Sequence, residues 1–120
     1  MPKIGEIWLA ALPPVNIPDQ PPEDVVGHEQ SGPRPTILLA IYEPVEMCMA
    51  VLLTSNLGAT RFYYTRLIKK SISNGLASDS VALVFHTRPL SYKRLVRKLG
   101  SVEVGYYTDI LRLLKEYLNL

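Results

Sequence analysis

The distribution of apolar and polar residues predicts a chain built mostly from short β-strands. Apolar, aromatic and β-branched residues gather in short segments separated by proline, glycine and other turn residues, which is typical of strands. We interpret the segment containing Trp8 as a strand that ends at Pro13 and Pro14, and the next two segments as a central antiparallel pair joined by a turn at Glu43 and Pro44. The predicted strands cover residues 4–12, 36–42, 47–53, 61–68 and 80–85.

The spacing of apolar residues changes near the C-terminus. In residues 91–99 apolar side chains recur at i, i+3, i+4 and i+7, which predicts a short helix with Ser91 as its N-cap and a basic outer face. Residues 104–118 repeat this spacing and predict a C-terminal helix. The elements together predict a mainly β protein of the α+β class, folded as a small, strongly curved antiparallel sheet or barrel with two helices.

Length and composition predict one folded domain over residues 1–120. The chain is 48% hydrophobic and 20% charged, and such a composition can bury a core. The apolar runs are far shorter than the roughly 20 residues that cross a bilayer, and the N-terminus lacks the apolar stretch of a secretory signal. We therefore expect no membrane association and a cytoplasmic location. The proline-rich residues 13–35 predict a long surface loop.

Cysteine and histidine are scarce. Cys48 is the only cysteine, which excludes an internal disulfide and a thiolate metal cluster within one chain. With His28 and His86 as the only histidines, we expect no metal and no other cofactor.

The charge is divided unevenly along the chain. Residues 1–58 carry two basic and seven acidic side chains, a net charge of −5, whereas residues 59–120 carry eleven and four, a net charge of +7. Between residues 61 and 98 only Asp79 is acidic. Such an imbalance favours a polyanion as the partner. The basic residues of this segment are Arg61, Arg66, Lys69, Lys70, Arg88, Lys93, Arg94, Arg97 and Lys98.

A polar cluster lies immediately before the second predicted strand. His28, Glu29, Gln30 and Arg34 supply an imidazole, a carboxylate, an amide and a permanent cation, and these groups cover acid, base and anion-stabilising roles. An alternative is a plain surface turn in which Arg34 pairs with Glu29.

Two further groups of residues follow predicted strands. The hydroxyls of Thr54 and Ser55 can donate to a phosphate, or they can simply end the strand in a turn. After residues 80–85 come His86 and Arg88, and the guanidinium of Arg88 can bind a phosphate with two parallel hydrogen bonds. The basic residues of the predicted 91–99 helix are better explained by an ordinary solvated face that adds a general positive field.

The order of these pieces resembles the MazF/PemK family of toxins. The resemblance rests on Gly5-Glu-Ile-Trp8, on Gly27-His-Glu-Gln-x-Gly-x-Arg-Pro35 and on Leu53-Thr-Ser55, followed by Gly75-Leu, Asp79-Ser-Val81, Arg88 and Lys93-Arg-Leu95. It implies a barrel related to SH3 folds, a homodimer, and metal-independent, sequence-specific cleavage of single-stranded RNA that a cognate antitoxin neutralises.

The resemblance also implies residue roles. Arg34 matches the catalytic arginine and Thr54 the hydroxyl paired with it. His28 and Glu29 match loop residues that transfer protons, and one of them is expected to be the base. Gln30, Ser55, His86 and Arg88 are the expected RNA contacts.

The fifth predicted strand departs from the family pattern. Where PemK-like members carry an arginine, an acid and a glutamine, this chain has Leu83, Phe85 and His86, and the imidazole of His86 is a candidate replacement. The departure keeps a second hypothesis open, in which a catalytically weakened barrel binds RNA or an antitoxin-like partner without cleavage. A plain SH3-like adaptor is a third reading, which leaves the motif at residues 27–35 unexplained.

Overall fold

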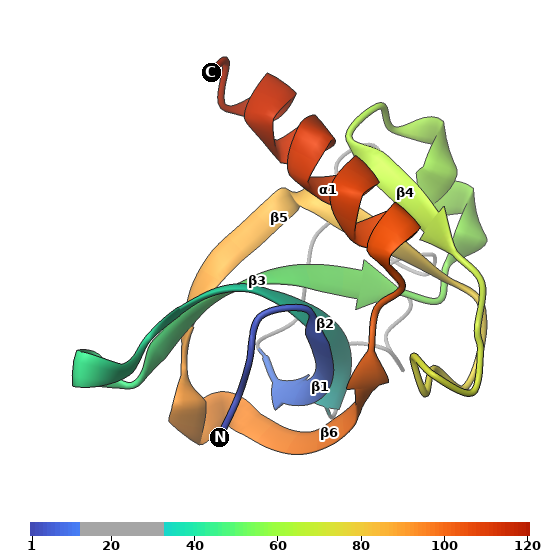
Figure 1. Ribbon diagram of the computed structural model, residues 1–120. Helices are drawn as coiled ribbons and strands as arrows, with labels where there is room; N and C mark the ends of the chain where they lie inside the picture. The colour runs from blue at the N-terminus through green and yellow to red at the C-terminus, as the bar shows by residue number, and fades with distance from the viewer. Residues whose placement is uncertain (13–32) are drawn as a thin grey trace.

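The computed structural model describes residues 1–12 and 33–120. Their six strands form one antiparallel sheet in the order β4-β5-β3-β2-β1-β6 (Figure 1). The edges of the sheet are therefore β4 and β6. In chain order the strands are β1 (Glu6–Ala11), β2 (Pro33–Tyr42), β3 (Met47–Thr54), β4 (Thr65–Ile68), β5 (Ser80–Ser91) and β6 (Leu95–Ser101).

The helical elements are short except at the C-terminus. Helix α1 (Val104–Tyr117) is the α-helix of the described residues, and it crosses one side of the sheet (Figure 1). Single 3₁₀ turns connect strands: η1 (Glu43–Val45), η2 (Leu57–Arg61) and η3 (Tyr92–Arg94).

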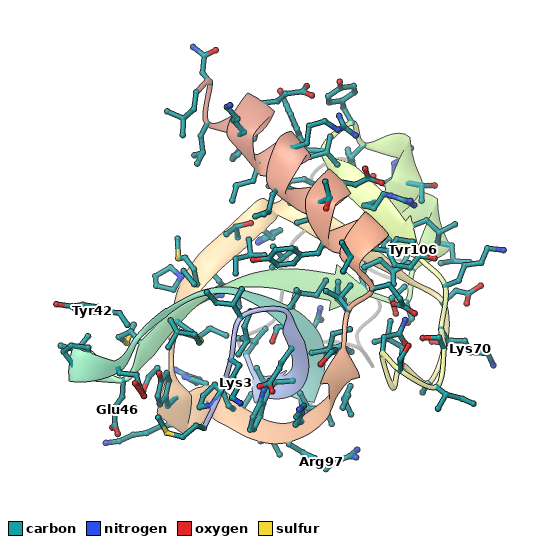
Figure 2. All side chains as sticks on the ribbon, in the orientation of Figure 1. Lys3, Tyr42, Glu46, Lys70, Arg97 and Tyr106 are labelled. Carbon is teal, nitrogen blue, oxygen red and sulfur yellow. The ribbon has the colours of Figure 1, made fainter. Side chains whose placement is uncertain are left out.

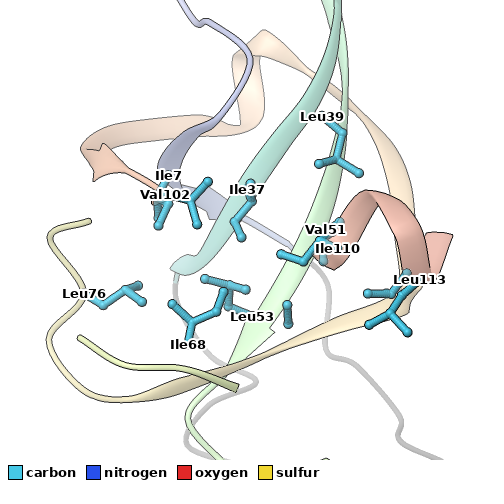
Figure 3. Close-up of a cluster of buried hydrophobic side chains, with 12 residues drawn as sticks. Ile7, Ile37, Leu39, Val51, Leu53, Ile68, Leu76, Val102, Ile110 and Leu113 are labelled. Carbon is cyan, nitrogen blue, oxygen red and sulfur yellow. The ribbon is translucent and has the colours of Figure 1, made fainter. Parts of the chain in front are cut away.

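The two faces of the sheet bury separate apolar clusters, because successive side chains of a strand point to opposite faces. On the face covered by α1, Ile37, Val51 and Leu53 pack with Ile110 and Leu113 of the helix (Figure 3). We call this the helix face. The opposite face, which we call the second face, carries the other cluster, built from Ala10, Leu12, Leu38, Cys48, Ala50, Leu52, Ala59, Val81, Leu83 and Leu90.

Most predicted elements are confirmed, with changed limits. The strands predicted at 4–12, 36–42 and 47–53 and the C-terminal helix are present. The strand predicted at 61–68 is confined to Thr65–Ile68, because η2 includes Arg61 and residues 62–64 form a bend. β5 continues to Ser91 through a register shift opposite Val51 and Leu52.

The helix predicted over residues 91–99 is wrong. After η3 the chain runs as edge strand β6, antiparallel to β1. Two register shifts in this pairing break the simple alternation of faces. Leu95 therefore packs with the second face, Leu99 with the helix face, and Val96 is 55% exposed. Spacing that is typical of a helix thus arises from an irregular strand.

The predicted closed SH3-like barrel is not confirmed. Over residues 1–12 and 33–120 the strands form an open sheet with one α-helix. The coarser prediction, a mainly antiparallel β protein closed by a C-terminal helix, is correct.

The loop between β4 and β5 is docked closely on β6. Gly75 has a φ of +70°, and a Cβ there would lie 2.0 Å from the carbonyl oxygen of Leu99. Gly100 faces the loop in return, since its Cβ would lie 2.4 Å from the carbonyl oxygen of Ser73. Both positions therefore require a residue without a side chain.

Polar contacts fix the same loop to the start of α1. Asn74 is fully buried, and its Oδ1 accepts hydrogen bonds from the backbone N–H groups of Ser71 and Leu76 at 3.0 and 3.1 Å. Its Nδ2 donates to Glu103 Oε1 at 3.1 Å, and Ser71 Oγ donates to Glu103 Oε2 at 2.6 Å. The loop, β6 and the helix start therefore form one hydrogen-bonded unit.

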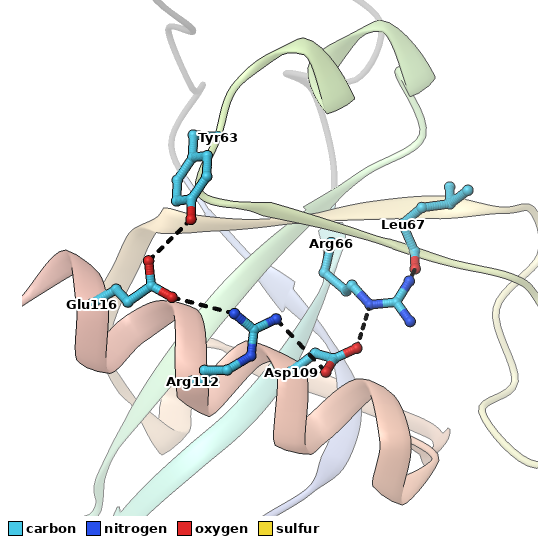
Figure 4. A network of polar contacts seen from close by, with 6 residues as sticks. All are labelled: Tyr63, Arg66, Leu67, Asp109, Arg112 and Glu116. Carbon is cyan, nitrogen blue, oxygen red and sulfur yellow. Dashed lines mark hydrogen bonds and ion pairs between the residues drawn. The ribbon is translucent and has the colours of Figure 1, made fainter.

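A second polar network ties the outer side of α1 to β4 and to the bend that precedes it. Arg66 Nε donates to Asp109 Oδ2 at 2.8 Å, and Arg112 lies between Asp109 and Glu116 (Figure 4). Glu116 also accepts a hydrogen bond from the hydroxyl of Tyr63 at 3.1 Å. These groups hold the helix against the β4 edge.

Candidate functional site

Arg34 lies in β2 near the middle of the sheet. It is paired with Ala10 of β1, and its side chain therefore shares the second face with Ala10, because directly opposed residues point to the same side. The side chain is almost completely buried, with 5% of the residue exposed. The arginine predicted to be a loop residue is thus part of the rigid scaffold.

Thr54 ends β3, the neighbour of β2 on its other side. The register between these strands pairs Thr36 with Leu52, and the same register continued by two residues sets Arg34 opposite Thr54. Thr54 is also paired with Val81 of β5 on the second face, and it is 4% exposed. Arg34 and Thr54 are therefore cross-strand neighbours on one face.

The hydroxyl of Thr54 is held by the turn that follows. The backbone N–H of Asn56 donates to Thr54 Oγ1 at 3.2 Å, and Asn56 Oδ1 in turn accepts from the N–H of Gly58 at 3.0 Å. Ser55 lies exposed between them. A guanidinium and a fixed hydroxyl in this relation can bind two oxygens of a phosphate.

Of the two predicted RNA contacts on β5, Arg88 lies farther away. Arg88 is paired with Ala50, four residues from Thr54 along β3, or roughly 13 Å at the usual rise of a strand. His86 is half-buried, and its ring centroid lies 5.4 Å from that of Phe85. The described structure thus brings Arg34 and Thr54 to one face, with Ser55 next to Thr54 in the chain, and leaves Arg88 at a distance.

Apolar packing occupies the positions where the family pattern has charged residues. Leu83 is paired with Leu52 and is fully buried. Phe85 packs edge-to-face on Phe62 with ring centroids 5.8 Å apart. These two side chains belong to the apolar packing of the second face, and neither can transfer a proton.

His28, Glu29 and Gln30 lie outside the described residues. Their predicted roles in proton transfer and RNA contact remain predictions.

Sequence reasoning missed a polar group at the start of β1. Glu6 is buried, and its Oε1 accepts hydrogen bonds from Trp8 Nε1 and from the backbone N–H of Lys3, each at 2.9 Å. Its Oε2 forms an ion pair with Lys98 Nζ at 2.8 Å. Burial alone would raise the pKa of Glu6, but these contacts outweigh it and hold the pKa below its ordinary value. The available signal was an acid two residues from a tryptophan in an otherwise apolar strand.

Most cations of the basic segment are spread over the molecular surface. Lys70 lies in the loop after β4 and Arg97 on β6, and both point away from the sheet (Figure 2). In the part of the chain that the structure describes, no three histidine, cysteine, aspartate or glutamate side chains form a group that could hold a metal ion. That part also holds no helix of the length and apolarity that a membrane crossing requires.

Comparison with known families decides the classification. Residues 3–118 match the model of the PemK-like, MazF-like toxin of type II toxin-antitoxin systems. The chain belongs to this family. No curated protein matches the sequence.

Solved MazF structures share the fold of this toxin-family chain. MazF from Deinococcus radiodurans (crystal form I) has a TM-score of 0.68 at 22% identity, covering 99% of this chain and 97% of that one. The Mycobacterium tuberculosis toxin MazF-mt6 has a TM-score of 0.66 at 15% identity, covering 96% and 97%. A mycobacterial endoribonuclease in complex with its cognate antitoxin has a TM-score of 0.66 at 17% identity, covering 100% and 97%.

Proposed function

We propose that this chain is a sequence-specific endoribonuclease, the toxin of a type II toxin-antitoxin pair, which cleaves single-stranded RNA without a metal ion. The observation that carries the proposal is that Arg34 and Thr54 lie on the same face of neighbouring strands. Membership of the toxin family and the likeness to a solved endoribonuclease support it. The protein acts as a single domain in the cytoplasm.

The reaction requires one attack and two proton transfers. The ribose 2′-oxygen forms a bond to the adjacent phosphorus and gives its proton to a base, for which His28 and Glu29 are the candidates. The bond from phosphorus to the 5′-oxygen breaks, and that oxygen takes a proton from an acid, for which Arg34 is one candidate. The products are a cyclic 2′,3′-phosphate and a 5′-hydroxyl.

Arg34 and Thr54 act on the charge that develops at phosphorus. The guanidinium of Arg34 neutralises the phosphorane oxygens, and the hydroxyls of Thr54 and Ser55 donate to the phosphate. Arg34 and Thr54 are 5% and 4% exposed, so the reaction requires a form of the protein in which a phosphate can contact both side chains.

A second candidate function follows from the same burial. Leu83 and Phe85 occupy positions where the family pattern has charged residues, and Arg34 is covered. Both features favour a protein that binds RNA or an antitoxin-like partner without cleaving RNA.

One assay separates the two functions. The purified protein is incubated with an unstructured RNA in EDTA, and the product ends are analysed. Cyclic phosphate and 5′-hydroxyl ends support the nuclease. RNA binding without products after prolonged incubation supports the second candidate, and cleavage that EDTA abolishes contradicts the metal-independent mechanism.

We also propose a homodimer that a cognate antitoxin binds. Exposed apolar residues line a pocket of about 190 Å³ at the far end of the sheet, where Ala40, Met49 and Pro89 are cross-strand neighbours. Leu111 of α1 and Leu118, which directly follows the helix, are exposed as well. Burial of such surfaces stabilises association. Sedimentation of the purified protein tests the homodimer. A dimer is expected, and a monomer at high protein concentration contradicts the proposal.

A further inference from the structure

Trp8 stands beside the Arg34–Thr54 pair. It lies on β1 opposite Thr36 of β2, and Arg34 is two residues from Thr36 on the same face. Such diagonal neighbours in an antiparallel pair lie about 7–8 Å apart, within reach of aromatic and long side chains. Thr36 Oγ1 donates to the carbonyl oxygen of Trp8 at 3.0 Å, which fixes the backbone between the two positions.

The indole of Trp8 is held in one orientation yet keeps exposed surface. Glu6 Oε1 accepts its Nε1–H at 2.9 Å, so the ring cannot turn without losing a hydrogen bond to a buried carboxylate. The side chain packs against the apolar cluster of the second face and remains half-buried. A fixed, partly exposed aromatic ring is a stacking surface for a nucleobase.

Cations border the indole on the side of β6. Lys98 is the cross-strand partner of Trp8, and its side chain is 48% exposed while one hydrogen-bond donor contacts Glu6 Oε2 at 2.8 Å. Farther along the same edge, Arg94 Nη1 donates to the carbonyl oxygen of Ala11 at 3.3 Å. An ammonium has three donors, so Lys98 can bind a phosphate and keep its contact with Glu6.

We propose that Trp8 and Lys98 form a nucleotide subsite next to the reacting phosphate, an inference that rests on the proposed action on RNA. Trp8 stacks on one base of the single strand, and Lys98 binds the phosphate attached to that nucleotide. Glu6 is a positioning residue, because it orients the indole and the ammonium together. A single-stranded RNA that crosses β1 and β2 then contacts first the Trp8–Lys98 subsite and next Arg34.

The chain has one tryptophan, so the intrinsic fluorescence of the protein reports on Trp8 alone. The probe is a single-stranded oligonucleotide with 2′-O-methyl groups, which removes the attacking hydroxyl. A set of these oligonucleotides carries one abasic position each, and fluorescence anisotropy of a dye on the oligonucleotide gives the Kd for every protein variant.

The expected result has three parts. Binding quenches the fluorescence of Trp8. One abasic position weakens binding to the parent by roughly tenfold or more, the range of one base stacked on an aromatic ring. Trp8→Ala shows the same weakening with the intact oligonucleotide and no further loss at that abasic position, whereas Trp8→Phe, which keeps a ring but loses the hydrogen bond to Glu6, binds with a Kd between those of the parent and Trp8→Ala.

Lys98 and Glu6 are tested by the salt dependence and the kinetics. Lys98→Gln lowers the slope of log Kd against log salt by about one, as the loss of one phosphate contact does. Lys115→Gln, an exposed lysine of α1, is the matched control and leaves the slope unchanged. Glu6→Gln raises KM with little change in kcat, a split that mere loss of stability does not produce below the melting temperature.

The outcomes distinguish the subsite from the nuclease. If the parent cleaves RNA and Trp8→Ala binds and cleaves RNA as the parent does, the subsite proposal is wrong and the proposed nuclease function is supported. If the abasic pattern is found without cleavage, the subsite stands and the nuclease is overturned. A parent that neither binds nor cleaves RNA overturns both.

Discussion

Arg34 of β2 and Thr54 of β3 lie on neighbouring strands and on the same face of the sheet, and both side chains face away from α1. The two residues come from interior strands of the sheet, each hydrogen-bonded to neighbours on both sides. Their relative position is therefore set by strand register rather than by a loop. A site built on strands in this way is preorganised, which lowers the cost of stabilising charge in a transition state.

Removing the hydroxyl of Thr54 is expected to impair cleavage. Thr54→Val keeps the shape of the side chain but loses the donor to the phosphate, and we expect cleavage to fall roughly a hundredfold. The N–H of Asn56 loses its 3.2 Å acceptor as well, at a cost of about 1 kcal/mol in unfolding free energy. Single-turnover kinetics and urea unfolding measure the two effects.

Thr54→Ser is the matched control because it keeps the oxygen. It should retain most of the activity. Thr54→Val cleaving at the parental rate would exclude a role for the hydroxyl in the reaction.

The sequence predicted the elements whose pattern is regular. The runs at 36–42 and 47–53 are strands in which residues 36–39 and 50–53 are buried without interruption, and the 104–118 spacing is a true helix because one of its faces packs on the sheet. The helix prediction for residues 91–99 failed because register shifts between β1 and β6 give this strand the apolar spacing of a helix. No local pattern distinguishes the two, since the deciding contact is with β1, far away in the chain.

The candidate site was only partly predictable. The resemblance pointed to Arg34 and Thr54, and strand pairing brings them together. Their depth of burial depends on the whole fold and was not foreseen. Glu6 and Trp8 were quoted for the resemblance without a role, because their link to Lys98 exists only through the pairing of β1 with β6.

Glycine is required at position 75 by both conformation and space. Gly75→Ala places a Cβ 2.0 Å from the carbonyl oxygen of Leu99, at a φ of +70°. We expect a loss of more than about 1 kcal/mol in unfolding free energy, measured by thermal and urea unfolding.

Gly105→Ala is the opposite case, since its Cβ meets nothing within 4 Å and the residue lies in α1. It should be neutral or stabilising by up to about 1 kcal/mol. Equal effects at the two positions would show that the loop is not docked on β6.

The free energy of unfolding should fall in acid because the carboxylates of Glu103 and Glu6 become protonated. A hydrogen bond from Ser71 is the largest cause that lowers the pKa of Glu103, and contacts with Lys98, Trp8 and Lys3 outweigh burial at Glu6. A lowered folded pKa means that each carboxylate stabilises the fold above the unfolded value of about 4.3. That contribution is lost as the pH falls through the folded pKa.

Urea unfolding between about pH 7 and pH 3 tests this dependence. Glu103→Gln and Glu6→Gln should each be less stable than the parent at neutral pH and should lose less stability in acid. If the unfolding free energy of both variants changed with pH in parallel with that of the parent, the lowered pKa values of Glu103 and Glu6 would not explain the loss of stability in acid.

The most direct test is the single-turnover rate at which an unstructured RNA is cut in EDTA by the parent and by Arg34→Ala, with circular dichroism and thermal unfolding as checks of the fold. The parent should cut, leaving cyclic phosphate and 5′-hydroxyl ends, and Arg34→Ala should be slower by roughly a thousandfold while still folded. Arg34→Lys, which keeps the charge but loses the two-pronged contact, should fall between them. A folded Arg34→Ala protein that cuts as fast as the parent would contradict the account.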